Sequence, residues 1–396
     1  MAGRRRASVS GALALCLLLV SLAGCGGRPA DGAATAEVQR LLDRRAAAVL
    51  AGDEAAFART GTQDGFARLR EVPLAAWSYD VTRLERTGDT ATADVRLRYR
   101  LAGYDPAPAT AGRVLRLSRG RDGRWRVGSD RPAARSARLP WDQGPVRVVR
   151  GAHGIVLGVG QSAGTLRGFA ALVDRAVPAV DDAWDGPWPR RVVVVVPHSL
   201  QDMAGLLGSP ASSYRGIAAV TTGETGGGTS APADRIVVNP DAYGLLGTLG
   251  KQVVLTHEST HVATRAHTTP ATPLWLSEGY ADWAAYRGSG RTPAQIAPEL
   301  SRAVAAGQVP DALPVDGDFG FTGDADELAR AYEAGWTACR MIAERWGEAE
   351  LGAFYRAVGA HERREGAVEE AMARVLGTSP EEFTARWRDY VRSRLG

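Results

Sequence analysis

The sequence feature that most constrains the fold is a pair of histidines four residues apart, His257 and His261, with Glu258 directly after the first. Side chains at this spacing on an α-helix point in nearly the same direction, about 40° apart around the helix axis. An apolar pattern of helical period leads into the motif over residues 245–254. Two neutral imidazoles on one helix face bind zinc, and the glutamate between them reaches a water on the metal. The motif therefore predicts a zinc-binding helix.

A third zinc ligand is predicted at Glu278, seventeen positions after His261. Two intervening prolines end the first helix, and a second helix is expected over residues 274–286. Three protein ligands leave one coordination position open, which distinguishes catalytic zinc from structural zinc. Asp282 follows Glu278 by four residues and shares its helix face. We therefore expect Asp282 to accept a hydrogen bond from the second ring nitrogen of a ligand histidine and to fix its tautomer.

His267 is a competing third ligand, because residues 257–267 nearly spell the three-histidine zinc pattern of the metzincins. That pattern has glycine at the position where this chain has Thr264. The glycine lets the chain turn out of the helix, and a β-branched residue resists the positive φ that such turns often use. The sequence therefore favours Glu278 over His267, with both left open at this stage.

The N-terminal segment has the order of features found in a secretory signal. Three arginines precede an apolar run that is too short to span a membrane. The run closes in a Leu-Ala-Gly-Cys segment ending at Cys25, which resembles the lipobox of bacterial lipoproteins. The resemblance implies that residues 1–24 are removed, that Cys25 carries lipid, and that residues 25–35 tether the protein to the extracytoplasmic side of the cell membrane. The alternative is an ordinary secreted protein cleaved near Ala23.

Charge and cysteine content narrow the possible partners and cross-links. The formal net charge of +4 falls to +1 (4 − 3) without residues 1–24, which hold three arginines and no acidic residue. No basic cluster remains that would predict nucleic-acid binding. Of the three cysteines, Cys16 lies in the predicted signal and Cys25 is the predicted lipid site. Cys339 is left alone, so no internal disulfide is expected and a buried thiol is its expected state.

The region from 36 to 132 is predicted to be a separate α+β domain. Apolar residues recur at helical spacing over residues 36–60. Four segments of alternating polarity follow, separated by turn residues, at 77–84, 91–101, 113–118 and 124–129. One long helix followed by a curled antiparallel sheet resembles the cone-shaped domains that are similar to nuclear transport factor two. A spacer or binding role is expected for it.

Residues 133–144 are rich in proline and arginine and are predicted to be a linker. Beyond it, residues 145–396 are predicted to form a second domain, so the fold class is α+β throughout. Its first part is expected to hold strands, at 146–149, 154–159, 191–196, 216–222 and 235–238. A glycine-rich loop at 223–232 is expected between the last two. The final third is expected to be helical, at 293–306, 324–346, 349–358, 366–376 and 380–394.

With these residues in place, the region from about 140 to 396 resembles the peptidase MA-like gluzincins. The similarity lies in the segments 256–262, 272–281, 331–336 and 344–347. The resemblance implies a thermolysin-like domain, with a mixed sheet, an active-site helix, a ligand helix and a helical lobe, and with the cleft between the lobes. It also implies Zn²⁺ as the cofactor.

The resemblance further suggests roles for two side chains. Glu258 is expected to act as general base, taking a proton from water and passing it to the leaving amine. Tyr332 is expected to donate to the developing oxyanion, although it also lies on an apolar helix stripe that would give it a packing role. The aminopeptidases of the clan carry a Gly-x-Met-Glu-Asn segment before the zinc helix, and no such segment is found here. Endopeptidase activity is therefore favoured over aminopeptidase activity.

These features predict a lipid-anchored zinc metallopeptidase that acts outside the cytoplasm on peptide or protein substrates. The strand predicted at 235–238 is expected to be the sheet edge that pairs with an extended substrate. The alternative is a non-catalytic cell-surface binding or assembly lipoprotein that retains a zinc-binding fold. The additional N-terminal domain and the lack of a recognisable specificity pocket favour that alternative.

Overall fold

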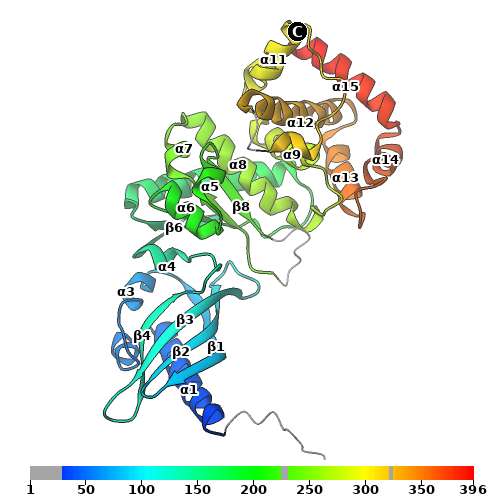
Figure 1. The fold of residues 1–396 in the computed structure, drawn as a ribbon. Helices are drawn as coiled ribbons and strands as arrows, with labels where there is room; N and C mark the ends of the chain where they lie inside the picture. The colour runs from blue at the N-terminus through cyan, green and yellow to red at the C-terminus, as the bar shows by residue number, and fades with distance from the viewer. Residues whose placement is uncertain (1–28, 224–230, 321–323) are drawn as a thin grey trace, which may run out of the picture.

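The computed structural model describes residues 29–223, 231–320 and 324–396. The predicted signal peptide, Cys16, the lipid site Cys25 and most of the glycine-rich loop lie outside the described residues. None of the described helices is both long and apolar enough to cross a membrane. The predicted α+β fold class is confirmed: one end of the molecule is a helix on a sheet, the middle is a second sheet with helices, and the other end is a helical lobe (Figure 1).

The N-terminal domain is a long helix packed on a four-stranded antiparallel sheet in the order β1-β2-β3-β4. Burial alternates along the central strand β2, as expected for a sheet with one face in the core. Its elements are α1 (Pro29–Ala51), α2 (Glu54–Ala58), α3 (Phe66–Leu69), β1 (Leu74–Thr87), β2 (Thr90–Leu101), β3 (Ala109–Arg119) and β4 (Trp125–Pro132).

Two details of the N-terminal helix differ from the prediction. The single helix predicted at 36–60 is two helices, because Gly52 adopts a φ of 65° and Asp53 caps α2 by accepting a hydrogen bond from Ala56 N. Helix α1 also begins at Pro29, so residues 29–35, which were predicted to be a flexible tether, are helical. Proline at the first helical position starts a helix well, since its missing N–H would have no helical partner there.

The second sheet has five strands in the order β5-β6-β7-β9-β8. Strands β6, β7 and β9 run parallel, and β5 and β8 are antiparallel edge strands. The prediction that 235–238 forms the sheet edge is wrong, because β9 lies between β7 and β8. Three of the four residues of β9 are buried, whereas β8 is mostly half-buried, which suits an edge. The strands are β5 (Val146–Arg150), β6 (Gly154–Val159), β7 (Val192–Val196), β8 (Ala219–Thr222) and β9 (Arg235–Val238).

Both faces of this sheet are covered, which explains the uninterrupted run of valines in β7. Val194 packs into the core formed with α5 (Ala163–Ala183) and α8 (Thr248–Thr264). Val193 and Val195, which point to the opposite face, pack into the core of the N-terminal domain. A strand buried on both faces needs apolar residues at every position. The N-terminal domain is therefore one of the two layers that enclose the sheet.

The predicted linker at 133–144 contributes to that shared core. It contains the short helix α4 (Pro140–Gln143), and Leu139 and Trp141 are buried. Asp142 accepts a hydrogen bond from Arg113 of β3 at 2.8 Å, and the side chains of this ion pair are almost fully buried. Breaking one partner of such a pair would leave an uncompensated charge, which costs several kcal/mol. The segment is therefore packed between the two units.

Short helices and turns connect the second sheet, and helices form the C-terminal lobe. The connecting elements are α6 (Leu200–Leu207), α7 (Pro240–Gly244) and 3₁₀ turns at Ala211–Tyr214 and Arg265–His267, and a further 3₁₀ turn, Asp316–Phe319, lies within the lobe. The lobe consists of α9 (Leu274–Tyr286), α10 (Pro293–Ile296), α11 (Pro298–Ala305), α12 (Ala325–Arg345), α13 (Glu348–Gly359), α14 (Ala367–Ala371), a π-helical segment (Met372–Leu376) and α15 (Pro380–Leu395).

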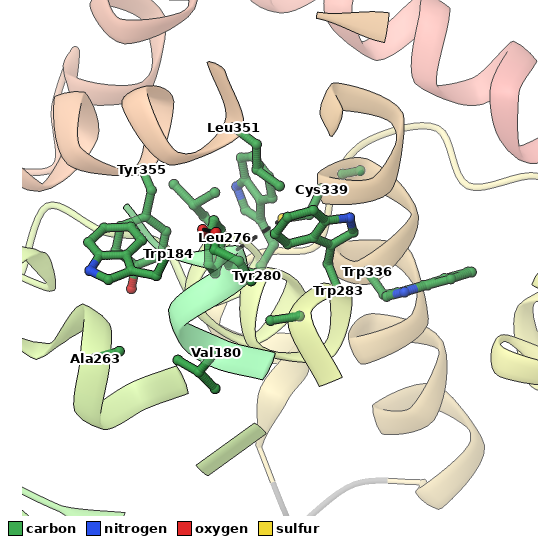
Figure 2. Packing of buried hydrophobic residues seen from close by; sticks show 14 of the residues in the cluster. Val180, Trp184, Ala263, Leu276, Tyr280, Trp283, Trp336, Cys339, Leu351 and Tyr355 are labelled. Atoms are coloured by element: carbon green, nitrogen blue, oxygen red, sulfur yellow. Dashed lines mark hydrogen bonds between the residues drawn. The ribbon is translucent and has the colours of Figure 1, made fainter. Parts of the chain in front are cut away.

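Helices α9 and α12 cross at very short distance because glycines face each other at the contact. A Cβ atom added at Gly279 would overlap the Gly335 carbonyl, and one added at Gly335 would lie 2.7 Å from the Trp275 carbonyl oxygen. Figure 2 shows large buried side chains of the same core, among them Tyr280 and Trp283 of α9 and Trp336 of α12. Cys339 is a buried free thiol, as predicted, and packs in the same core.

Candidate metal centre

Helix α8 presents both motif histidines on the same side, as the spacing predicted. His257 and His261 are half-buried, and their Nε2 atoms lie 3.0 Å apart. Most other residues of the helix are buried against the sheet and α9. The helix is therefore fixed by its packing, and the two ring nitrogens that face each other are held at one point of the surface.

Helix α9 brings Glu278 to the same point. Its Oε2 atom lies 3.2 Å from His257 Nε2 and 3.4 Å from His261 Nε2. Within residues 29–223, 231–320 and 324–396, these are the only three histidine, cysteine, aspartate or glutamate side chains whose ligand atoms gather closely enough to hold a metal ion. The three side chains come from two helices that pack against each other.

The separations between these atoms fit a zinc ion. Zinc bonds of about 2.0–2.1 Å in tetrahedral geometry place neighbouring ligand atoms about 3.3 Å apart, and the three observed separations run from 3.0 to 3.4 Å. Burial would raise the pKa of Glu278, but the two histidines outweigh it and lower the pKa. Two imidazole nitrogens and a carboxylate are also the donor set that zinc prefers. The residues therefore fit a zinc ion with one position left for another ligand.

Asp282 contacts the outer nitrogen of one histidine, where the sequence placed it. Its Oδ1 atom lies 2.8 Å from His257 Nδ1. Burial disfavours the charged imidazole of His257, but Asp282 and then Glu278 outweigh it, and the pKa of His257 is raised. A hydrogen bond from Nδ1–H to Asp282 leaves the lone pair on His257 Nε2, which faces the other two ligand atoms.

Glu258 is a buried carboxylate beside this group, 7% exposed. The hydroxyl of Thr221, on the edge strand β8, lies 2.6 Å from Glu258 Oε2. Sequence reasoning missed this contact. A strand over residues 216–222 was predicted, but nothing in the sequence indicates that it lies beside the helix that carries the histidines. Strand β8 has four residues, and the polarity of so short a strand does not indicate which helix or domain packs against each of its faces.

Tyr332 lies on α12 and is half-buried, with its ring 5.2 Å from that of Phe319 in an edge-to-face contact. Burial raises the pKa of its phenol well above the usual value, and the negative charges of Glu278, Asp282 and Glu258 raise it further. The phenol is therefore held in its protonated, donating form within the field of the site carboxylates. Tyr332 also packs against the apolar core, which is the packing role that its helix stripe predicted.

His267 does not join the metal-ligand group. It lies in the 3₁₀ turn after α8, and its ring is 5.6 Å from the ring of Trp184. Burial and the charge of Arg356 lower the pKa of its imidazole. The chain reaches this turn without the glycine of the three-histidine pattern because Thr264 and Arg265 keep helical φ and ψ values. The structure therefore separates His267 from the other two histidines.

Comparison with known proteins gives weak similarity to solved peptidase structures. No protein-family model and no curated protein matches the sequence. A mutant M1 zinc metallopeptidase from Deinococcus radiodurans is 14% identical, with a TM-score of 0.36, over 80% of this chain and 95% of that chain. A two-domain M1 zinc metallopeptidase mutant bound to L-arginine is 13% identical, and a Deinococcus radiodurans mutant bound to Tyr-Ser-Ala is 14% identical. Both have TM-scores of 0.35 and cover 80% of this chain and 94% of theirs. Such low similarity does not place the chain in that family, and its function has to be inferred from the site.

Proposed function

We propose that this protein is a zinc metallopeptidase. The observation that carries the proposal is the convergence of His257, His261 and Glu278 on one point, with a buried carboxylate, Glu258, beside them. A structural zinc site is closed by four protein ligands, whereas a catalytic site has three and keeps a position for water or substrate. Zinc-dependent hydrolysis needs a metal with an open position and a carboxylate beside it that can take up a proton, and this group of residues can supply both.

Each side chain of the site has a defined part in hydrolysis. Zinc, when bound here, would activate a water by lowering its pKa from 15.7 to about 7 and would polarise the scissile carbonyl. Glu258 takes the proton of the attacking water and delivers it to the leaving amine. Tyr332 donates a hydrogen bond to the oxygen on which negative charge develops. Asp282 holds His257 in the tautomer that binds the metal.

The edge of the second sheet supports a peptide as the substrate. Strand β8 is an edge strand, and it contacts α8. An extended peptide can pair with the unpaired backbone groups of such an edge and pass beside the metal ligands. The sequence before α8 lacks the Gly-x-Met-Glu-Asn segment of the aminopeptidases of the clan. We therefore propose cleavage within peptide chains, in a protein held by lipid at Cys25 on the extracytoplasmic side of a membrane.

Metal analysis and a peptide-library screen test this function. Purified protein should contain about one zinc per chain and should cleave library peptides. The Glu258→Gln variant should keep its zinc and lose activity by at least about 1,000-fold, since the general base is removed while the ligands remain. Equal activity in the variant would contradict the proposed mechanism. Zinc binding without any cleavage would favour the non-catalytic alternative.

Membrane attachment is tested separately. The Cys25→Ser variant should move from the membrane fraction to the soluble fraction, because the lipid-bearing sulfur is lost. Mass spectrometry of the N-terminal peptide should find acyl chains on Cys25 of the wild type. An unmodified N-terminus near Ala23 would show that the protein is secreted without an anchor.

A further inference from the structure

Within the described residues, one hydrogen-bond donor reaches the Glu258 side chain, and it comes from another element of the fold. The Thr221 hydroxyl lies 2.6 Å from Glu258 Oε2 and 3.1 Å from the Glu258 backbone oxygen. A hydroxyl has a single proton to donate, and the shorter contact is with the carboxylate. A donor to an ionised acceptor makes a hydrogen bond about twice as strong as one between neutral groups.

Glu258 has no other stabilising partner in the described parts of the chain. No arginine, lysine or histidine forms an ion pair with it, and no second donor contacts its oxygens. The side chain is 7% exposed, so water replaces such partners only in part. A buried carboxylate is costly unless it accepts hydrogen bonds. Among the described residues, the hydrogen bond to this carboxylate comes from Thr221.

We propose that Thr221 is a positioning residue that holds the Glu258 carboxylate in the orientation needed for proton transfer, an inference that rests on the proposed peptidase function. A glutamate side chain has three rotatable bonds, and the backbone of α8 fixes only its starting point. The hydrogen bond from β8 selects one orientation of the carboxylate. Misplacing a catalytic group by about 1 Å can cost about 100-fold in rate.

The location of Thr221 also connects the base with the substrate strand. Thr221 lies on the edge strand, and its side chain is directed at α8. The next residue, Thr222, lines a cavity of about 260 Å³ against the N-terminal domain, so the two threonines face opposite sides of the strand. A peptide that pairs with β8 therefore fixes the backbone that carries the donor to Glu258.

Kinetics of two substitutions at this position test the role. Thr221→Val keeps the shape and removes the hydroxyl, and it should lower kcat about 10- to 100-fold with KM changed less than about twofold. Thr221→Ser should restore kcat to within about threefold of the wild type. Both variants should retain the zinc content of the wild type. Equal kcat for Thr221→Val and wild type, in an active enzyme that Glu258→Gln inactivates, would overturn the role of Thr221 alone.

A matched control distinguishes loss of this hydroxyl from loss of a buried hydroxyl in general. Thr260 lies on α8, is 1% exposed, and donates to the Thr256 carbonyl of its own helix, at 2.9 Å. Thr260→Val should keep kcat within about twofold. A loss in Thr260→Val as large as in Thr221→Val would overturn the specific role, since general destabilisation would explain both.

Stability of the metal-free full-length protein gives a readout that does not depend on activity. Thr221→Val leaves the Glu258 carboxylate without its donor and should lower Tm by about 3 °C. In a Glu258→Leu background the carboxylate is absent, and the same substitution should lower Tm clearly less, because only the contact with the backbone oxygen of residue 258 is then lost. Equal shifts in the two backgrounds would overturn the contact. Failure of zinc-loaded wild type to cleave any peptide would contradict the proposed function and with it the catalytic role, whatever the Tm values.

Discussion

The third metal ligand, Glu278, and the Glu258 carboxylate are held in place by two different kinds of contact. Glu278 comes from α9, which meets α12 at a contact so close that Gly279 and Gly335 have no space for a side chain. Glu258 depends on one hydrogen bond from Thr221, on a strand at the free edge of a sheet. Close helix packing fixes a ligand rigidly, whereas an edge strand can shift with what pairs to it. We call the metal ligands and the packed helices that carry them the rigid half of the site; the Glu258 carboxylate depends in addition on one contact from an edge strand.

The largest effect is expected where the rigid half is disrupted. Gly279→Ala places a Cβ against the Gly335 carbonyl, and because backbone atoms cannot rotate away, the two helices must separate. The free energy of unfolding should fall by about 3 kcal/mol, and zinc should bind more weakly because Glu278 moves with α9. Denaturant unfolding and metal titration measure the two effects.

The control for that substitution is a helical glycine with space around it. Gly168 lies within α5, and a Cβ added there would meet nothing within 4 Å. Gly168→Ala should stabilise the protein by about 0.5–1 kcal/mol, since alanine is the better helix former. If Gly279→Ala behaved like Gly168→Ala, the helix contact would not be as rigid as the comparison requires.

A smaller effect is expected from the group that orients one ligand. Asp282→Asn keeps the size of the side chain but removes the charge that accepts the hydrogen bond from His257 Nδ1. Zinc affinity should fall about 10- to 100-fold, and the free energy of unfolding of the metal-free protein should change little by comparison. Competition with a fluorescent zinc chelator measures the affinity. An unchanged dissociation constant would show that helix packing alone orients His257.

The sequence predicted the rigid half of the site well because its determinants are local. Spacings of four residues place His257 with His261 and Glu278 with Asp282 whatever the rest of the fold does. The helices that carry them were also predicted within a few residues. Spacing alone does not predict that α8 and α9 pack against each other. The glycines at 279 and 335 indicate a different close contact, between α9 and α12.

The rest of the site depends on contacts between distant segments, and there the sequence was less informative. The valine run at Val192–Val196 was predicted to be a strand, but the sequence did not indicate that the N-terminal domain covers one of its faces. The prediction that β9 is the sheet edge was wrong. Strand order depends on how the chain connections cross the sheet, and no local pattern records that. Thr221 and Glu258 are 37 residues apart, and no local pattern links them.

The smallest effect concerns a titratable group within the rigid pair of helices. Glu333 of α12 accepts hydrogen bonds from the backbone N–H groups of Glu299, at 3.2 Å, and Leu300, at 2.5 Å. Burial nevertheless raises the pKa of Glu333 to about 7, above its usual value of 4.5, although the Leu300 N–H opposes the shift. Because the folded state binds this proton more tightly than the unfolded state does, the protonated Glu333 stabilises the fold fully below pH 4.5. The stabilisation is lost as the pH rises through about 7.

Glu333→Gln removes this titration while keeping an oxygen for the two N–H groups. Relative to the variant, the wild type should therefore lose stability between pH 4.5 and 7, by on the order of 1 kcal/mol. Urea unfolding of both proteins at pH 5 and pH 8 measures the difference. If the wild type instead gained stability relative to Glu333→Gln over this range, the N–H donors at the start of α11 would outweigh burial. The contact between α11 and α12 would then hold an ionised carboxylate, and the rigid half of the site would be strengthened, not weakened, at alkaline pH.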